Sequence, residues 1–254
     1  MTAAARERLQ VQAPVLCISA VAWILLLAGP GCTAMQVYHS GMTGISSSST
    51  LGMLLMPNSP APLALGWALM LAAMMGPLLS EPVLHVRDRS FARRRAHAIA
   101  LFVAGYSAVW MAVGVVLLGL ALVAELVAPE SYVPVTLAIV IALVWQFSPV
   151  KQRCLNRFHA QRELAAFGWA ADIDAIRFGL TQGVWCAGAC WALMLIPLLI
   201  SRGHLEAMAA VTVWLFAEQL EKPGPLCWRR RGPGTAVRIV VAQARMRLSV
   251  LKTT

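Results

Sequence analysis

Three sulfur-bearing side chains recur at helical spacing within one apolar stretch of the chain. Cys186, Cys190 and Met194 follow one another at intervals of four residues, so an α-helix places them on one face. Thiolate and thioether are soft ligands that favour Cu(I) over hard cations. The alternative interpretation is that these residues only fill space, because cysteine and methionine also pack as ordinary apolar side chains.

A second sulfur group lies in an earlier apolar stretch. Met70 and Met74 share a helical face, although such a stripe is also typical of a packed core. The following Gly76-Pro77 is expected to bend the helix or to free a carbonyl, which the bilayer core tolerates only where protein covers it. Both sulfur groups are expected at similar depth in the bilayer. We therefore predict a Cu(I) site formed by Cys186, Cys190, Met194, Met70 and Met74.

A third set of soft ligands lies in the polar segment 32–60. Its spacing begins Cys-x2-Met-x3-His-x2-Met and matches no closed zinc pattern. The pattern is compatible with capture of a soft metal and equally with an ordinary loop. The set comprises Cys32, Met35, His39, Met42, Met53 and Met56.

Two acidic residues occur near the end of the last apolar stretch. Glu221 beside Lys222 is typical of a membrane boundary, whereas Glu218 lies one turn deeper. An ionisable group within a span is a functional candidate by default. We expect Glu218 to pair with Arg177 or Lys151, or to assist an ion. No Ser-His-Asp order, H-E-x-x-H or P-loop is present, so no enzyme is predicted.

The composition indicates a membrane protein. Hydrophobic residues make up 59% of the 254 residues and charged residues only 13%, against about a quarter charged in soluble domains. The charges cluster between apolar runs of the length that spans a bilayer as a helix. The net charge is +10, and the basic residues responsible for it lie in the segments that flank these runs. A basic excess in such segments is typical of membrane insertion. The lipid bilayer is therefore the expected partner, and nucleic acid is not.

The predicted fold is all-α and polytopic, with about six transmembrane helices. The first span is expected to be retained as an anchor, the segment 81–97 to be a basic loop, and 149–178 to hold an amphipathic helix at the interface. The domains would be a cytoplasmic N-terminus at 1–14, a transmembrane domain at 15–222 and a basic cytoplasmic tail at 223–254. The six spans are expected near 15–29, 61–79, 98–124, 133–147, 180–200 and 207–220.

The basic residues predict the orientation. An even number of spans puts both termini on one side, and that side would carry 20 of the 21 lysines and arginines. The positive-inside rule places this side in the cytoplasm. Both termini are therefore expected inside the cell.

Three segments, 67–77, 146–155 and 179–194, together resemble the family of predicted metal-binding integral membrane proteins of largely undefined function. Its members include a copper-delivery protein that serves a bacterial membrane tyrosinase. The resemblance covers roughly 61–225 and includes the ending at 218–222. It rests on Cys-x3-Cys-Trp after Gly-Leu, with Gln-x-Ser-Pro-x-Lys-x-x-Cys-Leu before it.

The resemblance implies roles for particular residues. Cys186 and Cys190 fall where the family's suspected metal-binding cysteines fall, and Cys154 matches the cysteine after the Pro-x-Lys motif. Met74, Met75 and Pro77 match the family's Met-Met-x-Pro run.

The chain also departs from the family pattern. Ala189 and Phe158 stand where many relatives carry further cysteines, and Ala217-Glu218-Gln219-Leu220 separates the Ala-rich run from the closing Glu-Lys. The missing sulfurs weaken the implied metal site and leave Cys154 without its usual neighbour.

The functional prediction is a Cu(I)-binding protein of a bacterial inner membrane that delivers copper to a membrane or exported copper enzyme. The alternative is a non-catalytic structural or assembly subunit, whose sulfur residues would only pack helices. A small-solute transporter is less well supported, because almost no charge is expected at mid-membrane. No oligomeric state is predicted.

Overall fold

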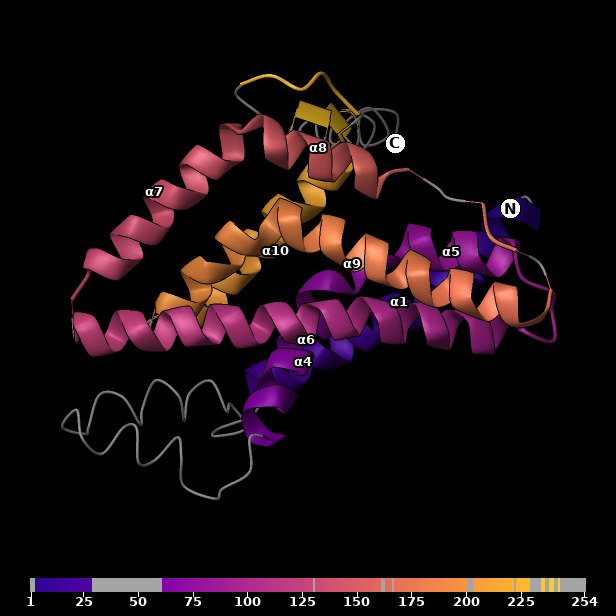
Figure 1. The fold of residues 1–254 in the computed structure, drawn as a ribbon, viewed down its shortest axis with the longest axis horizontal. Coiled ribbons are helices and arrows are strands. Elements are labelled where there is room, and N and C mark those ends of the chain that lie inside the picture. The colour runs from indigo at the N-terminus through magenta and orange to yellow at the C-terminus, as the bar shows by residue number, and fades with distance from the viewer. Residues whose placement is uncertain are drawn as a thin grey trace, which may run out of the picture.

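The computed structural model describes residues 3–28, 61–129, 131–160, 163–165, 167–200, 203–221, 223–228, 234–235, 238–239 and 242. The predicted metal-capture segment 32–60 lies outside this part, as does most of the basic tail. All regular elements in the described residues are helical, which confirms the all-α prediction (Figure 1). They are α1 (Ala3–Ala28), α4 (Ala61–Met75), η1 (Pro77–Leu79), α5 (Ser80–Asp88), α6 (Arg95–Val127), α7 (Val133–Phe147), α8 (Pro149–Phe158), α9 (Gly168–Leu199) and α10 (His204–Gln219).

Two of the described helices, α6 and α9, are long and apolar enough to cross a membrane. Two bent helix pairs would raise the number to four. One pair is 64–75 with 77–88, bent by 59°, and the other is α7 with α8, bent by 67°. The apolar part of α1, Gln12–Ala28, is shorter than the helices that are counted as candidate spans. Six spans with both termini inside therefore stay a prediction, as does the domain division, and α1 extends through the expected N-terminal tail.

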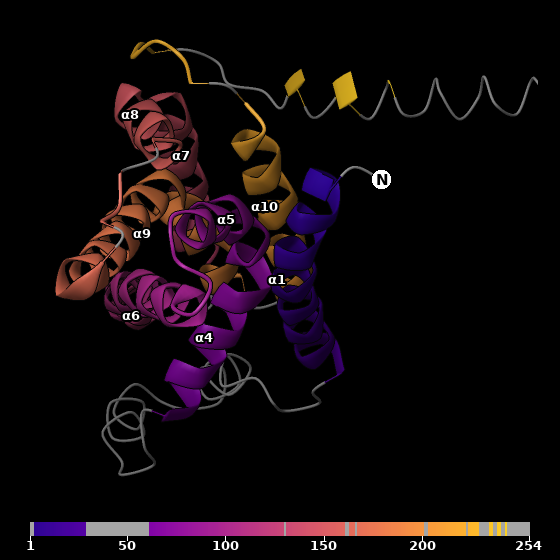
Figure 2. The ribbon, with the colours of Figure 1, turned by 90° about the vertical axis from the view of Figure 1, so that its right-hand side faces the viewer.

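The helices α6 and α9 form the centre of the fold and lie side by side in both views (Figures 1 and 2). Glycines allow their backbones to approach closely. A Cβ on Gly179 would lie 2.2 Å from the carbonyl oxygen of Phe102, and one on Gly105 would lie 2.6 Å from that of Ile176. Small residues at such contacts are typical of helix packing in membranes. The position of α9 is therefore set by α6.

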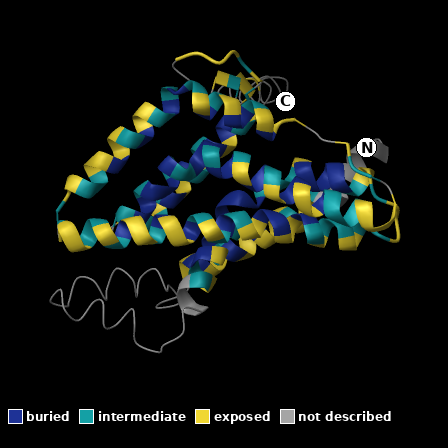
Figure 3. Cartoon of the chain, viewed as in Figure 1, coloured by how far each residue is buried: buried dark blue, intermediate teal, exposed yellow. Residues whose placement is uncertain are grey.

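The outer faces of α6 and α7 expose apolar side chains, seen as yellow segments in Figure 3. Val115 and Val116 on α6 and Leu137 and Leu143 on α7 are each more than half exposed. Apolar surface of this extent is typical of contact with lipid or with another protein. These faces therefore support the membrane interpretation.

The break between α4 and α5 follows from Pro77. Proline has no backbone N–H, so the carbonyl of Ala73 loses its helical donor. Ser19 Oγ and Trp23 Nε1 of α1 donate to that oxygen at 2.7 and 3.1 Å. The predicted bend and freed carbonyl are both present, and α1 covers the carbonyl. The expected basic loop at 81–97 is wrong in its first half, because the chain continues after the bend as helix α5.

The break between α7 and α8 follows from Ser148-Pro149. The Ser148 hydroxyl accepts a hydrogen bond of 3.1 Å from the backbone N–H of Lys151, a helix cap. An amphipathic helix is present as predicted, but its buried face contacts α9 and includes Lys151 and Cys154. The segment 149–178 also contains the first residues of α9, which begins at Gly168, well before the expected start of the fifth span at residue 180.

Candidate metal site

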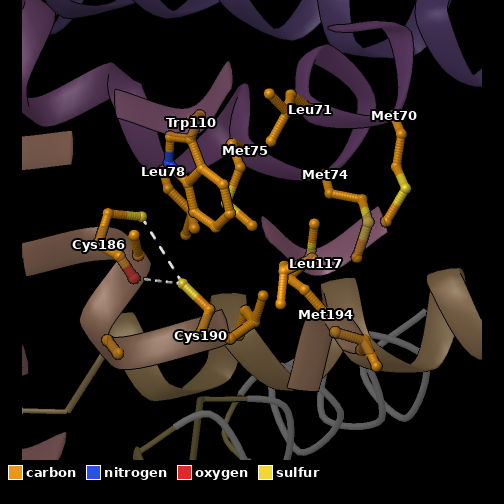
Figure 4. Close-up of a cluster of buried hydrophobic side chains, with 14 of the residues drawn as sticks. Met70, Leu71, Met74, Met75, Leu78, Trp110, Leu117, Cys186, Cys190 and Met194 are labelled. Carbon is orange, nitrogen blue, oxygen red and sulfur yellow. Dashed lines mark hydrogen bonds between the residues drawn. The ribbon is translucent and has the colours of Figure 1, made fainter. Parts of the chain in front are cut away.

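The fold brings the five predicted ligands into one buried cluster. Each of these side chains is at most 2% exposed, and all belong to the same apolar core (Figure 4). Two helices supply them, α9 with Cys186, Cys190 and Met194, and α4 with Met70 and Met74. We call these five residues the sulfur cluster. The sequence spacing placed residues on one face of each helix, and the fold turns both faces toward the same interior.

The two cysteines are close enough to share one ion. Their sulfur atoms are 3.7 Å apart, and the Cys190 thiol donates to the carbonyl oxygen of Cys186 at 2.6 Å. A thiolate binds zinc at about 2.3 Å, and two bonds of this length to one ion span 3.7 Å only if the angle at the metal is bent. A bent pair leaves coordination positions open for further ligands. The thioethers of the same core are the donors suited to fill them.

Tyr106 on α6 contacts the cysteine pair directly. Its hydroxyl donates to the sulfur of Cys186 at 3.2 Å, and the residue is buried. A hydrogen bond to sulfur stabilises the thiolate form that binds metal. Sequence reasoning missed Tyr106. The signal that was available is the polar hydroxyl inside an apolar helix, because a buried tyrosine usually finds a partner for its hydroxyl.

A tryptophan pair holds α4 against α6. Trp67 Nε1 donates to the carbonyl oxygen of Trp110 at 2.9 Å, and its ring occupies the space that a Cβ on Gly114 would need. This contact holds α4, with its methionines, in the core that also contains the cysteine pair. Met75 also belongs to the buried core and is drawn between Trp110 and Met74 in Figure 4. Met75 was noted beside Met70 and Met74 in the same apolar stretch, but it was not included in the predicted ligand set.

The potential metal ligands in the described core are mainly sulfur atoms, which are soft donors. Among the described residues, no group of three or more His, Cys, Asp and Glu side chains could hold a metal ion. The third cysteine with a suggested role, Cys154, is buried against α9, where a Cβ on Gly188 would lie 2.8 Å from its sulfur. Thiols and thioethers are thus the donors that this part of the structure gathers.

A second buried cluster is polar and joins α7, α8 and α10. Lys151 Nζ lies 2.7 and 3.0 Å from the two carboxylate oxygens of Glu218 and 2.5 Å from Gln146 Oε1. Trp214 Nε1 donates to Glu218 Oε1 at 3.0 Å, and the Gln146 amide donates to the same oxygen. Of the two expected partners of Glu218, the fold provides Lys151, whereas Arg177 is exposed. We call this set the Lys151 network.

The fold and the sulfur cluster define an all-helical protein with membrane-type helices and soft metal donors in its core. The chain belongs to the PpoB2 copper chaperone family, whose profile matches residues 64–242 and so includes the whole sulfur cluster. The predicted copper-delivery family is thereby confirmed. No curated protein and no solved structure matches the chain significantly.

Proposed function

We propose that the protein binds Cu(I) at the sulfur cluster and delivers it to a membrane or exported copper enzyme. Cys186 and Cys190 supply two thiolates, and Met194, Met70 and Met74 supply exchangeable thioethers. The observation that carries the proposal is the buried pair of thiol sulfurs 3.7 Å apart within a core that also contains these methionines. Sulfur donors of this kind select Cu(I).

Copper moves by ligand exchange, without a change of oxidation state. Binding requires both thiols to lose their protons, so two thiolates and one Cu(I) leave one net negative charge. The hydrogen bond from Tyr106 to Cys186 offsets part of the cost of burying that charge. Thioethers are neutral and remain available in either state, so one Cu–S bond forms as another breaks.

The order of ligands along α9 gives the exchange a direction. Met194 lies one turn beyond Cys190 toward the C-terminal end of the helix. In the predicted orientation, this end faces away from the cytoplasm. Copper would pass from the cysteine pair to Met194 and then to an acceptor on the outer side, where an exported client is found.

The site assignment is tested by metal analysis of detergent-purified protein loaded with Cu(I) under reducing conditions. Cys186→Ala with Cys190→Ala is expected to lose tightly bound copper. The matched control is Cys17→Ala with Cys227→Ala, which removes two exposed cysteines instead. A double variant of the cluster that retains the parental stoichiometry contradicts the proposal. A metal-free parent in a tight complex with another subunit would favour the assembly role.

A further inference from the structure

A cavity of about 650 Å³ lies between α1, α4, α5 and α6. Figure 2 shows α1 on the opposite side of α4 and α5 from α6 and α9. The volume falls within the range of about 300–1,000 Å³ that is typical of small-molecule sites. Two exposed apolar side chains, Ile18 of α1 and Val103 of α6, line the cavity. Both lie on helices that are predicted to cross the membrane, so the cavity opens sideways toward the bilayer.

The walls of the cavity are mainly apolar. Leu71, Met75 and Trp110 line its inner part and are buried. Of the described residues that line it, Arg87 alone is charged. A hydrophilic ligand would lose its water against such walls without gaining enough hydrogen bonds in return. A hydrocarbon chain loses nothing there, because burying apolar surface is itself favourable.

The cavity is elongated, and its single charge lies at one end. Arg87 belongs to the last turn of α5, which packs against the first turns of α6 beside Ile99. Met75 and Trp110 belong to the core at the other end. The wall along α6 runs from Ile99 to Met111, and twelve residues of helix rise about 18 Å. One leaflet of a bilayer has a hydrocarbon depth of about 15 Å, so the cavity has the length of one acyl chain.

The charged end of the cavity belongs to a strongly basic segment. Residues 87–95 contain five arginines and one aspartate. Arg94 pairs with Asp172 at 2.6 Å, whereas Arg89 and Arg93 are exposed. Basic pockets between transmembrane helices bind the headgroups of anionic lipids. The charge around this end therefore favours an anionic headgroup over a zwitterionic one.

Aromatic side chains place the same end at the level of lipid headgroups. Trp169, at the start of α9, is 78% exposed. The exposed rings of Phe91 and Phe167 lie 4.9 Å apart. Arg94 joins these residues to the basic segment by donating to the carbonyl oxygen of Gly168 at 3.2 Å. Exposed tryptophan next to basic residues is typical of the boundary between membrane and water.

We propose that the cavity binds one acyl chain of an anionic phospholipid, whose phosphate contacts Arg87. The chain extends along the apolar walls to Met75 and Trp110, and the second chain stays in the bilayer beyond Ile18 and Val103. A guanidinium has five N–H donors, so Arg87 binds the phosphate beside the interactions it makes within the protein. The inference goes beyond the proposed function and does not depend on copper, so either can fail without the other.

The lipid site is tested by photo-cross-linking in reconstituted bilayers of phosphatidylcholine. A trace of phosphatidylglycerol or phosphatidylcholine carries a diazirine at the end of one acyl chain, and mass spectrometry maps the adducts. The phosphatidylglycerol probe is expected to label the inner wall at Leu71 and Met75. Equal labelling of this wall by both probes would overturn the anionic ligand. Adducts confined to the outer faces, at residues such as Val115 and Leu137, would overturn the site itself.

The contact with the phosphate is tested by Arg87→Gln. Labelling of the inner wall by the phosphatidylglycerol probe is expected to fall about fivefold, on the scale of one basic residue's attraction to anionic lipid. Arg87→Lys retains the charge and should retain most of the labelling. Arg89→Gln is the control, because Arg89 is exposed and does not line the cavity. Equal labelling in Arg87→Gln and Arg89→Gln would exclude the proposed contact.

The place of the acyl chain is tested by filling the cavity. Ser107→Phe adds a ring to a residue that lines the cavity, whereas Ala108→Phe adds it to the next exposed residue of α6, which does not. Labelling of the inner wall is expected to fall severalfold in Ser107→Phe only, with the adducts on the outer faces unchanged in both variants. Equal labelling of the inner wall in the two variants would contradict a chain inside the cavity.

Discussion

The sulfur cluster and the Lys151 network are both buried, yet their bonding differs. In the network, the ammonium, the carboxylate, the amide and the Trp214 indole satisfy one another at hydrogen-bond distance. In the sulfur cluster, the metal donors are thiols and thioethers, which are weak hydrogen-bonding groups. The network is built as a fixed cross-link, whereas the cluster keeps ligands that can exchange. A buried charge in a span is therefore weaker evidence for function here than a group of neutral sulfurs.

The largest effect on stability is expected from removing one charge of the network. Lys151→Met leaves Glu218 buried without its counter-ion, and breaking such a pair costs about 3–5 kcal/mol. Thermal unfolding in detergent measures the loss. Lys151→Met combined with Glu218→Leu removes both charges and is expected to recover most of it. A single variant as stable as the parent would show that the network is not a structural cross-link.

A smaller effect is expected at the contact between α6 and α9. Gly179→Ala places a methyl group 2.2 Å from the Phe102 carbonyl oxygen, so the two helices must separate. Overpacking of this kind costs about 1–3 kcal/mol. Copper affinity should fall as well, because α9 carries the cysteines. Gly119→Ala on α6 is the control, since no atom lies within 4 Å of its added Cβ. If both variants behave alike, the close approach does not position the site.

The smallest effect on stability is expected within the sulfur cluster. Met194→Leu conserves volume and polarity, and such a swap costs less than about 1.5 kcal/mol. It removes a thioether, so Cu(I) affinity should fall although the fold is retained. Met208→Leu is the matched control, because Met208 is equally buried in the same core and lies outside the proposed ligand set. Competition with a chromogenic Cu(I) chelator measures both. Equal affinities would leave Met194 as a packing residue only.

The sequence predicted those elements that depend only on the residues within one segment, such as apolar runs, a proline and helical spacing. The apolar run at 133–147 coincides with α7, and the run at 98–124 lies within α6. The bend at Gly76-Pro77 follows from the missing N–H of proline and needed no tertiary information. The sulfur stripes were also found locally, because spacing alone assigns residues to one helical face.

The remaining features depend on contacts between distant segments. Lys151 and Glu218 are 67 residues apart, so the basic face of α8 was expected at the interface and is instead partly buried. Tyr106 becomes part of the site only because α6 packs on α9, and the carbonyl of Ala73 is covered only because α1 packs against α4. No periodicity within one segment predicts these contacts.

X-ray absorption at the copper edge of the Cu(I)-loaded protein tests the central claim most directly. The account predicts sulfur as the nearest scatterer, at about the 2.3 Å of metal–thiolate bonds. Cys186→Ser with Cys190→Ser should abolish this shell, whereas Cys17→Ser with Cys227→Ser should leave it unchanged. A shell of nitrogen or oxygen in the parent, or a sulfur shell that loss of Cys186 and Cys190 leaves unchanged, would contradict a Cu(I) site built on this cysteine pair.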